Sequence, residues 1–201
     1  MKTSINNREQ LNLIIENISN RHSFLTEECK YDLLKVAKLV CVKSKTLIVK
    51  ENQIADKLFY ISQGCLRAYY IKEWKDITDW FAFEEEFISS INSYFKNIPS
   101  PHFIEALEPT IYIEIKRKDI INITKKHRCF ETLSLKSTQQ FMLLLQSRIV
   151  ALQFETAQIK YDNLLLTKPN ILKRVPLTHI ASYLGITLET LSRIRNAKKR
   201  I

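Results

Sequence analysis

The side chains best suited to chemistry lie near the carboxyl end of the sequence, at Leu188, Glu189, Ser192, Arg193 and Asn196. Their spacing places them on one face of a helix. A glutamate carboxylate accepts a hydrogen bond from the amino group of cytosine, and an arginine donates two to O6 and N7 of guanine. An exposed leucine can rest on the methyl group of thymine. This face is therefore a candidate surface for reading DNA bases, with Leu188, Glu189, Ser192 and Arg193 as the base contacts.

Such a face needs two helices to hold it, and the preceding residues predict them. Gly185 can adopt the positive φ of a tight turn without steric cost, and Thr187 can cap a following helix. The apolar spacing fits two short helices that cross at a steep angle. This apolar set consists of Ile180, Ala181, Leu184, Ile186, Leu191 and Ile194. The pattern predicts a helix-turn-helix, with an ordinary helical hairpin as the alternative.

The distribution of charge favours a polyanionic partner for this part of the chain. The 201 residues hold 31 Lys and Arg against 21 Asp and Glu, a net charge of +10. From Lys160 onward, nine basic residues face only Asp162 and Glu189, so that segment carries +7. A basic segment of this kind is typical of nucleic-acid binding, and a solubilising tail is the alternative. The expected phosphate contacts are Thr178, Thr187, Arg195, Lys198, Lys199 and Arg200.

Several classes of function find no support in the sequence. Gly64 and Gly185 are the only glycines, so a Walker loop and a dinucleotide-binding fingerprint are excluded. No nucleophile–base pair or metal-ligand cluster stands out, and we expect neither an enzyme nor a bound cofactor or metal. No apolar run approaches the ~18 residues of a membrane span, and the amino terminus lacks a signal-peptide core. We therefore expect a soluble, cytoplasmic protein without a membrane partner.

The four cysteines are scattered and form no C-x-x-C pair; they are Cys29, Cys41, Cys65 and Cys129. Zinc and iron–sulfur sites usually draw on closely spaced ligands. We interpret the cysteines as buried or surface thiols in a reducing compartment. A scattered redox or cluster site is the alternative.

The spacing of apolar residues and the local composition predict helices, then strands, then helices again along the chain. Residues 7–39 show helical spacing, with Thr26 as a cap. Residues 42–116 read as short strands rich in Ile, Phe, Tyr and Trp, separated by polar turns that include "EWKD" and Gly64. Residues 119–166 are again helical, and one long helix is apolar on more than one face. We expect that helix to pack against a second copy through Phe130, Leu133, Phe141, Leu144, Arg148 and Leu152; burial within one subunit is the alternative.

In this order, the elements resemble the Crp/Fnr family of bacterial transcription regulators over nearly the whole chain. The motifs that carry the resemblance are "LFYISQGCLRAYYI", "ITDWFAFEEEFISS", "SPHFIEALEPTIYIEIKRKDI" and "RVPLTHIASYLGITLETLSRIR". The resemblance implies an α+β fold with N-terminal helices, a jelly-roll domain like those that bind cyclic nucleotides, a long dimerisation helix and a C-terminal winged helix-turn-helix. It implies a homodimer on a palindromic operator, with RNA polymerase and a small effector as further partners of the family. The family's Glu-x-x-Ser-Arg motif falls on Glu189, Ser192 and Arg193.

The sensor end departs from the nucleotide-binding members of that family. Their Gly-Glu pair falls here near Glu85 and Glu86, and their Arg-Ser pair near Ser100 and Pro101, with His102 beside it. A buried phosphate without a cation is costly, and two adjacent carboxylates repel it. We therefore expect a degenerate pocket that does not respond to cyclic nucleotide. The cysteine cluster of iron–sulfur sensors and a placed haem histidine are both missing from the sequence.

These expectations give three parts: a sensor domain at 1–125, a dimerisation helix at 126–158 and a DNA-binding domain at 159–201. The predicted function is sequence-specific DNA binding by a dimeric transcription regulator. The alternative is a sensor whose barrel binds an unidentified small effector that switches DNA binding. An empty barrel would favour that alternative, and a barrel filled by Trp80, Phe81 and Phe83 would oppose it.

Overall fold

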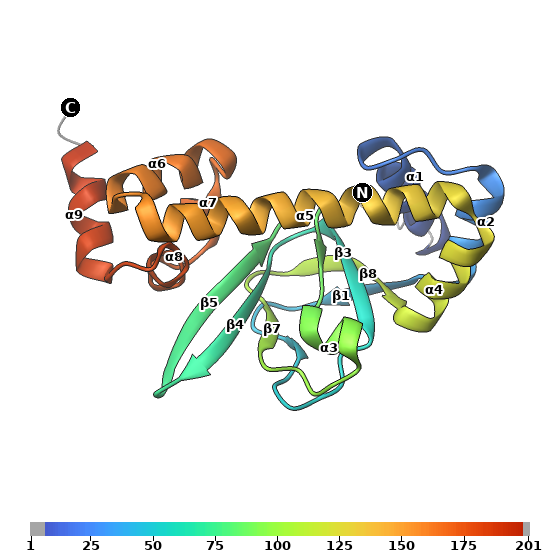
Figure 1. The fold of residues 1–201 in the computed structure, drawn as a ribbon, viewed down its shortest axis with the longest axis horizontal. Coiled ribbons are helices and arrows are strands. Elements are labelled where there is room, and N and C mark those ends of the chain that lie inside the picture. Colours follow the sequence, from blue (N-terminus) through green and yellow to red (C-terminus); the bar gives the residue numbers. More distant parts are fainter. Residues whose placement is uncertain (1–6, 199–201) are drawn as a thin grey trace, which may run out of the picture.

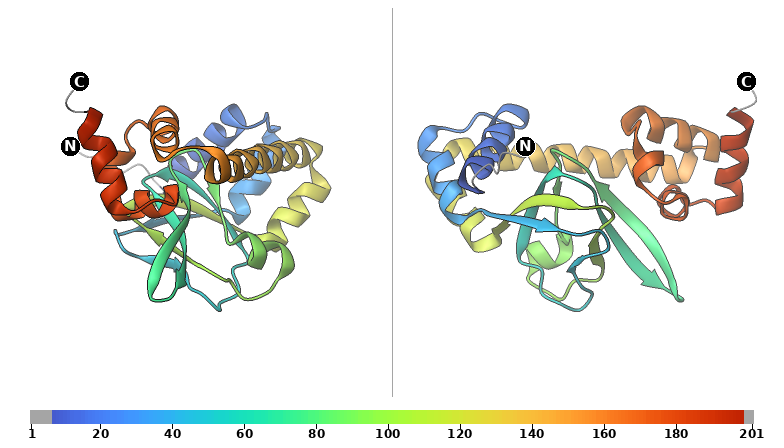
Figure 2. Two further views of the ribbon diagram at one scale, coloured as in Figure 1. Left: turned by 60° about the vertical axis from the view of Figure 1, so that its left-hand side comes forward. Right: turned by 180° about the vertical axis from the view of Figure 1, so that it is seen from behind.

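A computed structural model describes residues 7–198 of the chain, with the side chains of residues 197 and 198 left undescribed. A β-sandwich lies along one side of a single long helix, with a helical cap at one end and further helices at the other (Figure 1). The two further views show the same arrangement (Figure 2). No helix among the described residues is long and apolar enough to cross a membrane.

Along the described part of the chain, the helices lie before and after the strands, except for one short helix among them. They are α1 (Asn7–Arg21), α2 (Glu27–Val36), α3 (Ile91–Lys96), α4 (Arg117–Lys126), α5 (Arg128–Phe154), α6 (Ala157–Thr167), α7 (Ile171–Arg174), α8 (Leu177–Leu184) and α9 (Leu188–Lys198).

The strands form two antiparallel four-stranded sheets, ordered β1-β8-β3-β6 and β2-β7-β4-β5. They are β1 (Lys38–Val42), β2 (Leu47–Val49), β3 (Lys57–Gln63), β4 (Leu66–Lys72), β5 (Lys75–Ala82), β6 (Phe87–Ile88), β7 (Phe103–Ala106) and β8 (Thr110–Lys116). The crossovers between non-consecutive strands are those of a jelly roll, which confirms the predicted fold class.

Both turns expected between the strands are present. Gly64 joins β3 to β4 with a φ of 104°, and an added Cβ would lie 2.8 Å from the Cα of Thr110. Glu73 and Trp74 join β4 to β5, both with positive φ, and Lys72 pairs with Lys75 across them. Two central residues of positive φ are typical of the tight hairpin turn that matches the twist of paired strands. The β4–β5 hairpin projects from the sandwich as a two-stranded ribbon (Figure 1).

One predicted strand segment is a helix instead. Residues 86–95 read as a strand because of their aromatic residues, but α3 occupies 91–96 and only Phe87–Ile88 is a strand. The hydroxyl of Ser93 accepts a hydrogen bond from the Ala55 amide at 2.7 Å. Asn97 ends the helix in the left-handed region. These tertiary contacts outweigh the local preference of the aromatic residues for strands.

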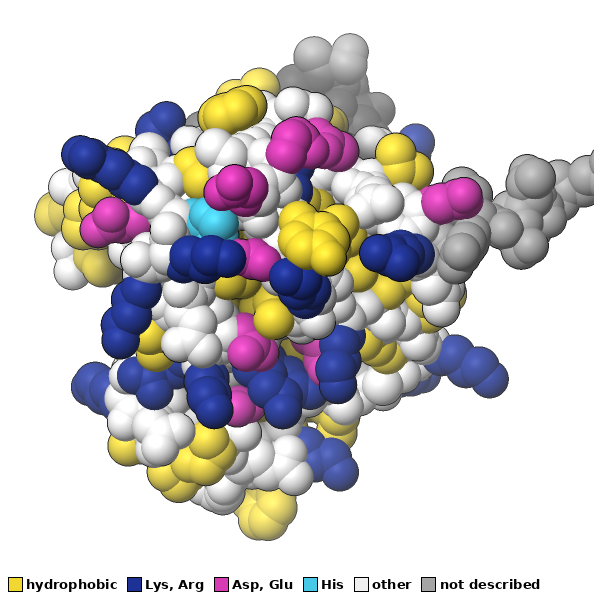
Figure 3. All heavy atoms as spheres, turned by 90° about the vertical axis from the view of Figure 1, so that its right-hand side faces the viewer, with side chains coloured by type: hydrophobic (Ala, Val, Ile, Leu, Met, Phe, Trp, Pro, Cys, Tyr) yellow, Lys and Arg dark blue, Asp and Glu magenta, His cyan; other side chains and the backbone are white. Residues whose placement is uncertain are grey.

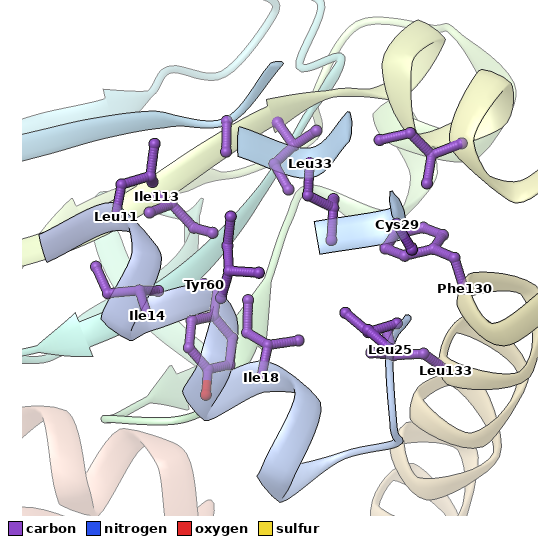
Figure 4. Close-up of a cluster of buried hydrophobic side chains, with 14 residues drawn as sticks. Leu11, Ile14, Ile18, Leu25, Cys29, Leu33, Tyr60, Ile113, Phe130 and Leu133 are labelled. Atoms are coloured by element: carbon purple, nitrogen blue, oxygen red, sulfur yellow. The ribbon is translucent and has the colours of Figure 1, made fainter. Parts of the chain in front are cut away.

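The helical cap and the start of α5 share one dry core. Thr26 caps α2 by accepting a hydrogen bond from the Cys29 amide, as expected. Apolar side chains from α1, α2, α5 and the adjoining sheet meet in this core (Figure 4). Its buried members are Leu11, Ile14, Ile15, Ile18, Leu25, Cys29, Leu33, Ala37, Tyr60, Ile113, Ile115, Ile123, Phe130 and Leu133. The outer surface of this end carries Lys and Arg side chains interspersed with Asp and Glu (Figure 3).

The last helical region contains more breaks than the sequence indicates. His127 separates α4 from α5, and its ring bonds to Asp32 at 2.9 Å. Thr156 caps α6 by accepting from the Ile159 amide. The described part of the chain after Lys116 contains helices alone, so the wing that the family resemblance implies is not among the described residues.

Candidate nucleic-acid interface

Gly185 makes the turn between α8 and α9 as the sequence predicts. Its φ is 66°, and its amide donates to the carbonyl of Ser182. The amide of Ile186 reaches back to the carbonyl of Ala181 at 3.0 Å. This pair of bonds is the usual way in which a left-handed residue ends a helix. An added Cβ at Gly185 would lie 3.2 Å from a Leu152 methyl, so the turn also lies against the end of α5.

The predicted apolar set forms the core of this helical pair. Ile180, Ala181, Leu184, Leu191 and Ile194 are buried, and Ile186 is packed against them. Residues from the preceding helices complete the core. They are Tyr161, Leu164, Ile171 and Val175. The two helices are therefore a helix-turn-helix resting on α6 and α7.

The first turn of α9 is fixed by its cap. The Thr187 hydroxyl accepts from the amide of Thr190 at 3.2 Å. A hydrogen bond from its own amide and another from Thr187 hold the pKa of Glu189 below its ordinary value. Glu189 is therefore an ionised acceptor at neutral pH, located at a helix start that favours negative charge.

The structure brings the predicted base-reading residues together on the outer face of α9. Leu188, Glu189, Arg193 and Asn196 are exposed, and Ser192 is half-buried. Of the expected phosphate contacts, Thr178 and Thr187 are exposed and Arg195 is half-buried. Lys198 ends α9, whereas Lys199 and Arg200 lie outside the described residues.

Two of the nine basic residues counted from Lys160 onward face the sensor domain instead. Arg174 forms a two-pronged bond with Glu84, at 2.7 and 2.8 Å, and its Nε donates to Glu108 at 2.9 Å. Lys168 pairs with Glu86. Burial acts to raise the pKa of Glu84, but the bonds from Arg174 and the Gly64 amide hold that pKa below its ordinary value. The positive charge left for a polyanion is thus concentrated on and around α9.

The β4–β5 hairpin and α5 both contact α8. The amide of Thr78 donates to the Ser182 hydroxyl at 2.9 Å. Arg148 donates to the carbonyl of Tyr183 at 3.1 Å, and its guanidinium lies 3.9 Å from the centre of the Tyr183 ring. The ring of Phe81 lies 5.2 Å from that of Tyr183. These contacts fix the helix-turn-helix relative to the sandwich.

A buried arginine lies at the centre of this junction. Arg67, on β4, is 1% exposed, and it pairs with Asp76 at 2.8 Å and with Glu105 at 2.9 Å. It also donates to Nε2 of His179, on α8, at 3.2 Å. Since arginine can only donate, His179 must accept, and its neutral form is the one that fits. Burial, followed by the charge of Arg67, lowers the pKa of His179.

The residues expected to form a degenerate ligand pocket fall into two separate groups. Glu85 accepts from Asn17 at 3.1 Å and pairs with Arg21 at 3.2 Å, both on α1. Glu86 is paired with Lys168. Both carboxylates therefore have partners within the chain, which neutralise their charges.

The second group lies inside the sandwich. The Ser100 hydroxyl is 2.8 Å from that of Ser90 and donates to the carbonyl of His102 at 2.7 Å. Pro101 between them is half-buried. His102 is 4% exposed, and neither of its ring nitrogens bonds to a described residue. Burial lowers the pKa of His102. Ser90, at the start of α3, is a member of this group that the sequence pattern does not indicate.

Two of the three aromatic residues considered as barrel filling lie outside the sandwich interior, and the third, Trp80, packs against the interior cluster from its edge. Phe81 and Phe83 belong to the core of the helix-turn-helix junction. The Trp80 ring lies 5.4 Å from that of Phe141 on α5. The interior is filled by other apolar side chains, including the rings of Phe59 and Tyr112, whose centres lie 5.4 Å apart. Its buried members are Val49, Ala55, Phe59, Ile61, Leu66, Ala68, Ala82, Ile88, Ile104, Ala106 and Tyr112.

The structure corrects the expected dimer seam at two of its six residues. Phe130 and Leu133 are buried in the dry core, because α1 and α2 cover the start of α5. Phe141 contacts Trp80, and Arg148 holds Tyr183. Leu144 and Leu152 remain exposed. Exposed apolar residues on α5 also include Leu135, Met142, Leu143, Leu145, Ile149, Val150 and Phe154.

Comparison with known proteins agrees with this architecture. The chain matches no known protein-family model and no curated protein sequence. It is similar to the solved structure of FixK2 from Bradyrhizobium japonicum, with 18% identity and a TM-score of 0.69 over 81% of this chain and 84% of that one. It is similar to a CooA mutant from Carboxydothermus hydrogenoformans, with 19% identity and a TM-score of 0.67 over 98% and 86%.

A third similar structure is that of a protein from Eubacterium rectale assigned to the crp/fnr family of transcriptional regulators. It shares 18% identity with a TM-score of 0.66, over 87% of this chain and 84% of that one. The same order of sandwich, long helix and helix-turn-helix thus recurs at low sequence identity. The chain has the fold of the Crp/Fnr regulators.

Proposed function

We propose that the chain is a sequence-specific DNA-binding transcription regulator of the Crp/Fnr type, acting as a homodimer on a palindromic operator. The observation that carries this proposal is the outer face of α9, where ionised Glu189, exposed Arg193 and half-buried Ser192 lie together. Nearby cations that could compete for a polyanion, Lys168 and Arg174, are neutralised by sensor carboxylates. The fold shared with FixK2 and CooA supports the same role.

In this proposal, some residues of α9 and its surroundings contact DNA bases, and others contact DNA phosphates. Arg193 donates to guanine, Glu189 accepts from cytosine, and Leu188 and Ser192 contact the neighbouring bases. Thr178, Thr187 and Arg195 contact phosphates, and so position the protein without specifying sequence. Lys198, Lys199 and Arg200 are assigned to phosphates from the sequence alone. The three parts at 1–125, 126–158 and 159–201 would act as sensor, dimer helix and DNA-binding domain.

The exposed face of α5 gives a revised dimer seam. Leu135, Met142 and Ile149 recur every seven residues, and Leu145 and Leu152 fall on the alternate positions of the same repeat. All five are exposed in the single chain. An apolar stripe with this spacing is the seam of a two-stranded coiled coil. Pairing two copies along it would present two α9 helices to half-sites about one helical turn apart.

Selection of sequences from a random duplex pool tests the DNA-reading surface. We expect wild type to recover a palindrome, and Arg193→Ala to lose preference at one guanine per half-site. Lys173→Ala is the matched control, because Lys173 is exposed and basic but lies on α7. It should recover the wild-type motif. Recovery of no motif, with binding that merely weakens with salt, would contradict the assignment of Glu189, Ser192 and Arg193.

Sedimentation of the full chain tests the seam. Ile149→Glu places a charge on the stripe, and we expect it to sediment as a monomer. Ser147→Glu adds the same charge at an exposed position of α5 that the heptad spacing puts on the side away from the stripe, and it should remain dimeric. Equal behaviour of the two variants would contradict the revised seam.

A second candidate function, a switch controlled by an unidentified effector, rests on His102. A neutral imidazole carries one donor and one acceptor, and leaving them unpaired in a buried place costs about 1–3 kcal/mol. A small effector bonding to His102 would remove that cost. The sandwich offers no arginine at the matching position, Ser100, so cyclic nucleotide is not the effector we propose. Addition of cyclic AMP should leave the thermal midpoint unchanged, and an increase would contradict this view.

His102→Leu separates a switch from a vestigial pocket. If the pocket is vestigial, the variant should melt higher than wild type and bind DNA equally well. If the pocket takes an effector, DNA binding by the variant should no longer respond to small-molecule extracts that alter wild-type binding.

A further inference from the structure

Two cysteines that are 100 positions apart in the sequence meet where α2 packs on the start of α5. The amide of Cys29 donates to the Thr26 hydroxyl at 3.3 Å, and that hydroxyl lies 3.7 Å from the sulfur of Cys129. The Thr26 hydroxyl thus joins the Cys29 backbone to the Cys129 side chain, and each cysteine contributes to the shift in the pKa of the other. Cys129 packs against the dry core of which Cys29 is a buried member. The fold thus places two thiols side by side.

The two thiols differ in access to solvent. Cys29 is 0% exposed and lies beside the Phe130 ring within the core (Figure 4). Cys129, near the start of α5, is partly exposed. A small reagent arriving from water therefore meets Cys129 first, with Cys29 directly behind it.

The surroundings also give the two thiols different acidities. Cys129 is the second residue of the 27-residue helix α5, where unpaired amides favour a negative charge. Burial acts to raise its pKa, but bonds from Thr26, Cys29 and the Phe130 amide hold the pKa of Cys129 below its ordinary value. Burial and the bond to Cys129 raise the pKa of Cys29 to about 12. Cys129 is therefore the attacking thiolate, and Cys29 remains protonated.

We propose that Cys129 and Cys29 form a peroxide-reactive pair that closes to a reversible disulfide between α5 and α2. The thiolate of Cys129 attacks one peroxide oxygen; the O–O bond breaks, and the second oxygen leaves as water or an alcohol after taking a proton. Cys129 becomes a sulfenic acid. The Cys29 sulfur then attacks the Cys129 sulfur, the S–O bond breaks, and water leaves with the Cys29 proton. Two thiols are oxidised by two electrons, and one peroxide is reduced.

The remaining cysteines provide matched controls. Cys41 is exposed on β1, so it measures the reactivity of an accessible thiol away from the pair. Cys65 is buried at the helix-turn-helix junction, and burial raises its pKa. Neither shares the contacts with Thr26 that the pair has. This proposal is independent of DNA binding.

Mass spectrometry of the reduced full chain after treatment with hydrogen peroxide tests the proposal. We expect loss of two hydrogens, a linked peptide containing Cys29 and Cys129, and reversal by dithiothreitol. Cys129→Ser should abolish the linkage, whereas Cys41→Ser should retain it. Cys29→Ala should leave a sulfenic acid at Cys129 that dimedone captures. The oxidised wild type should also melt at a higher temperature, because the bond spans the dry core.

Three outcomes would overturn the proposal. They are oxidation of Cys41 without any Cys29–Cys129 linkage, a disulfide through Cys41 or Cys65 instead, and conversion of wild-type Cys129 to sulfinic acid. If Cys29→Ala does not fold, the comparison of wild type with Cys129→Ser decides alone, because Cys129 is only partly buried.

Discussion

The two ends of α5 are held in opposite ways. At its start, Phe130 and Leu133 are buried in an apolar core with α1 and α2. Toward its end, Arg148 holds the helix-turn-helix through a backbone carbonyl and an aromatic ring. Around that end, Arg67 and Arg174 join the sandwich to α8 and α7 through carboxylates and a histidine. The start of α5 is thus held by an apolar core, and the junction at its other end adds buried charge pairs to an apolar cluster.

This difference indicates which contacts of the molecule can rearrange at low cost in free energy. Separating the dry core exposes apolar surface to water at full cost. Separating the junction also exposes the apolar cluster that Phe81 and Phe83 share with the helix-turn-helix. Its charged groups, however, exchange protein contacts for contacts with water, and the net cost of each exchange is small. We therefore expect the charge pairs of the junction to rearrange more easily than either apolar core.

The largest effect on the free energy of unfolding should come from a substitution in the dry core. Leu133→Ala deletes a buried side chain that is 3% exposed, and should lower the free energy of unfolding by about 2–5 kcal/mol. Leu144→Ala is the control on the same helix: at 52% exposed, it should change that free energy by about 0.5 kcal/mol or less. Urea denaturation measures both. Equal losses would break the distinction between the two faces of α5.

A smaller, local effect should follow at the charged end. Arg174→Met keeps the length of the side chain but leaves Glu84 and Glu108 without their partner. We expect about 1–3 kcal/mol of local destabilisation, seen as faster hydrogen exchange in α7 and α8. Lys173→Met, on the exposed side of the same helix, should leave exchange unchanged. Unchanged exchange in the Arg174 variant would mean that the apolar contacts alone hold the junction.

Acid should loosen the same junction. The pKa of His179 is lowered in the folded protein, so its contribution to stability is complete above the unfolded value of about 6.5 and is lost as pH falls below it. We expect hydrogen exchange in α8 to rise between neutral pH and pH ~5. His179→Gln retains a neutral acceptor for Arg67 and should flatten that rise. The lowered pKa values of His22 and His102 affect both proteins equally, so a rise of the same size in the variant would assign the effect to them.

The smallest effect should arise at the tip of the hairpin that grips α8. Trp74 has a φ of 63° and is 99% exposed. Trp74→Gly removes the strain of a side chain in that conformation and should stabilise the protein by about 0.5–1 kcal/mol. Calorimetry would show the higher midpoint. A lower midpoint would mean that the tryptophan makes contacts that the single chain does not display.

The sequence predicts those parts of the fold that depend on local spacing. The helix-turn-helix follows from Gly185, Thr187 and the apolar set around them, which act within one short segment. The hairpin turn at "EWKD" is likewise local. The contacts of Arg67 with Glu105 and His179, and those of Arg174 with Glu84 and Glu108, could not be predicted, because they join residues that are tens of positions apart. A buried arginine in a strand looks the same in a sequence as an exposed one.

The misplaced predictions share one physical cause. The seam was chosen from helical spacing alone, but α1 and α2 cover one end of α5, and the hairpin covers a face near the other. The acidic run expected in the pocket pairs instead with Arg21, Lys168 and Arg174. Which face is covered depends on tertiary packing, and periodicity does not report it.

The two tryptophans of the chain differ in their exposure to solvent. Trp74 stands in water at the hairpin tip, and Trp80 is half-buried with its ring against Phe141 on α5. Their fluorescence should therefore separate: iodide should quench the redder emission of Trp74 and spare the bluer emission of Trp80. Trp74→Phe then leaves a single natural reporter on the surface between the sandwich and α5. Movement along that helix can be followed in real time without attaching a dye.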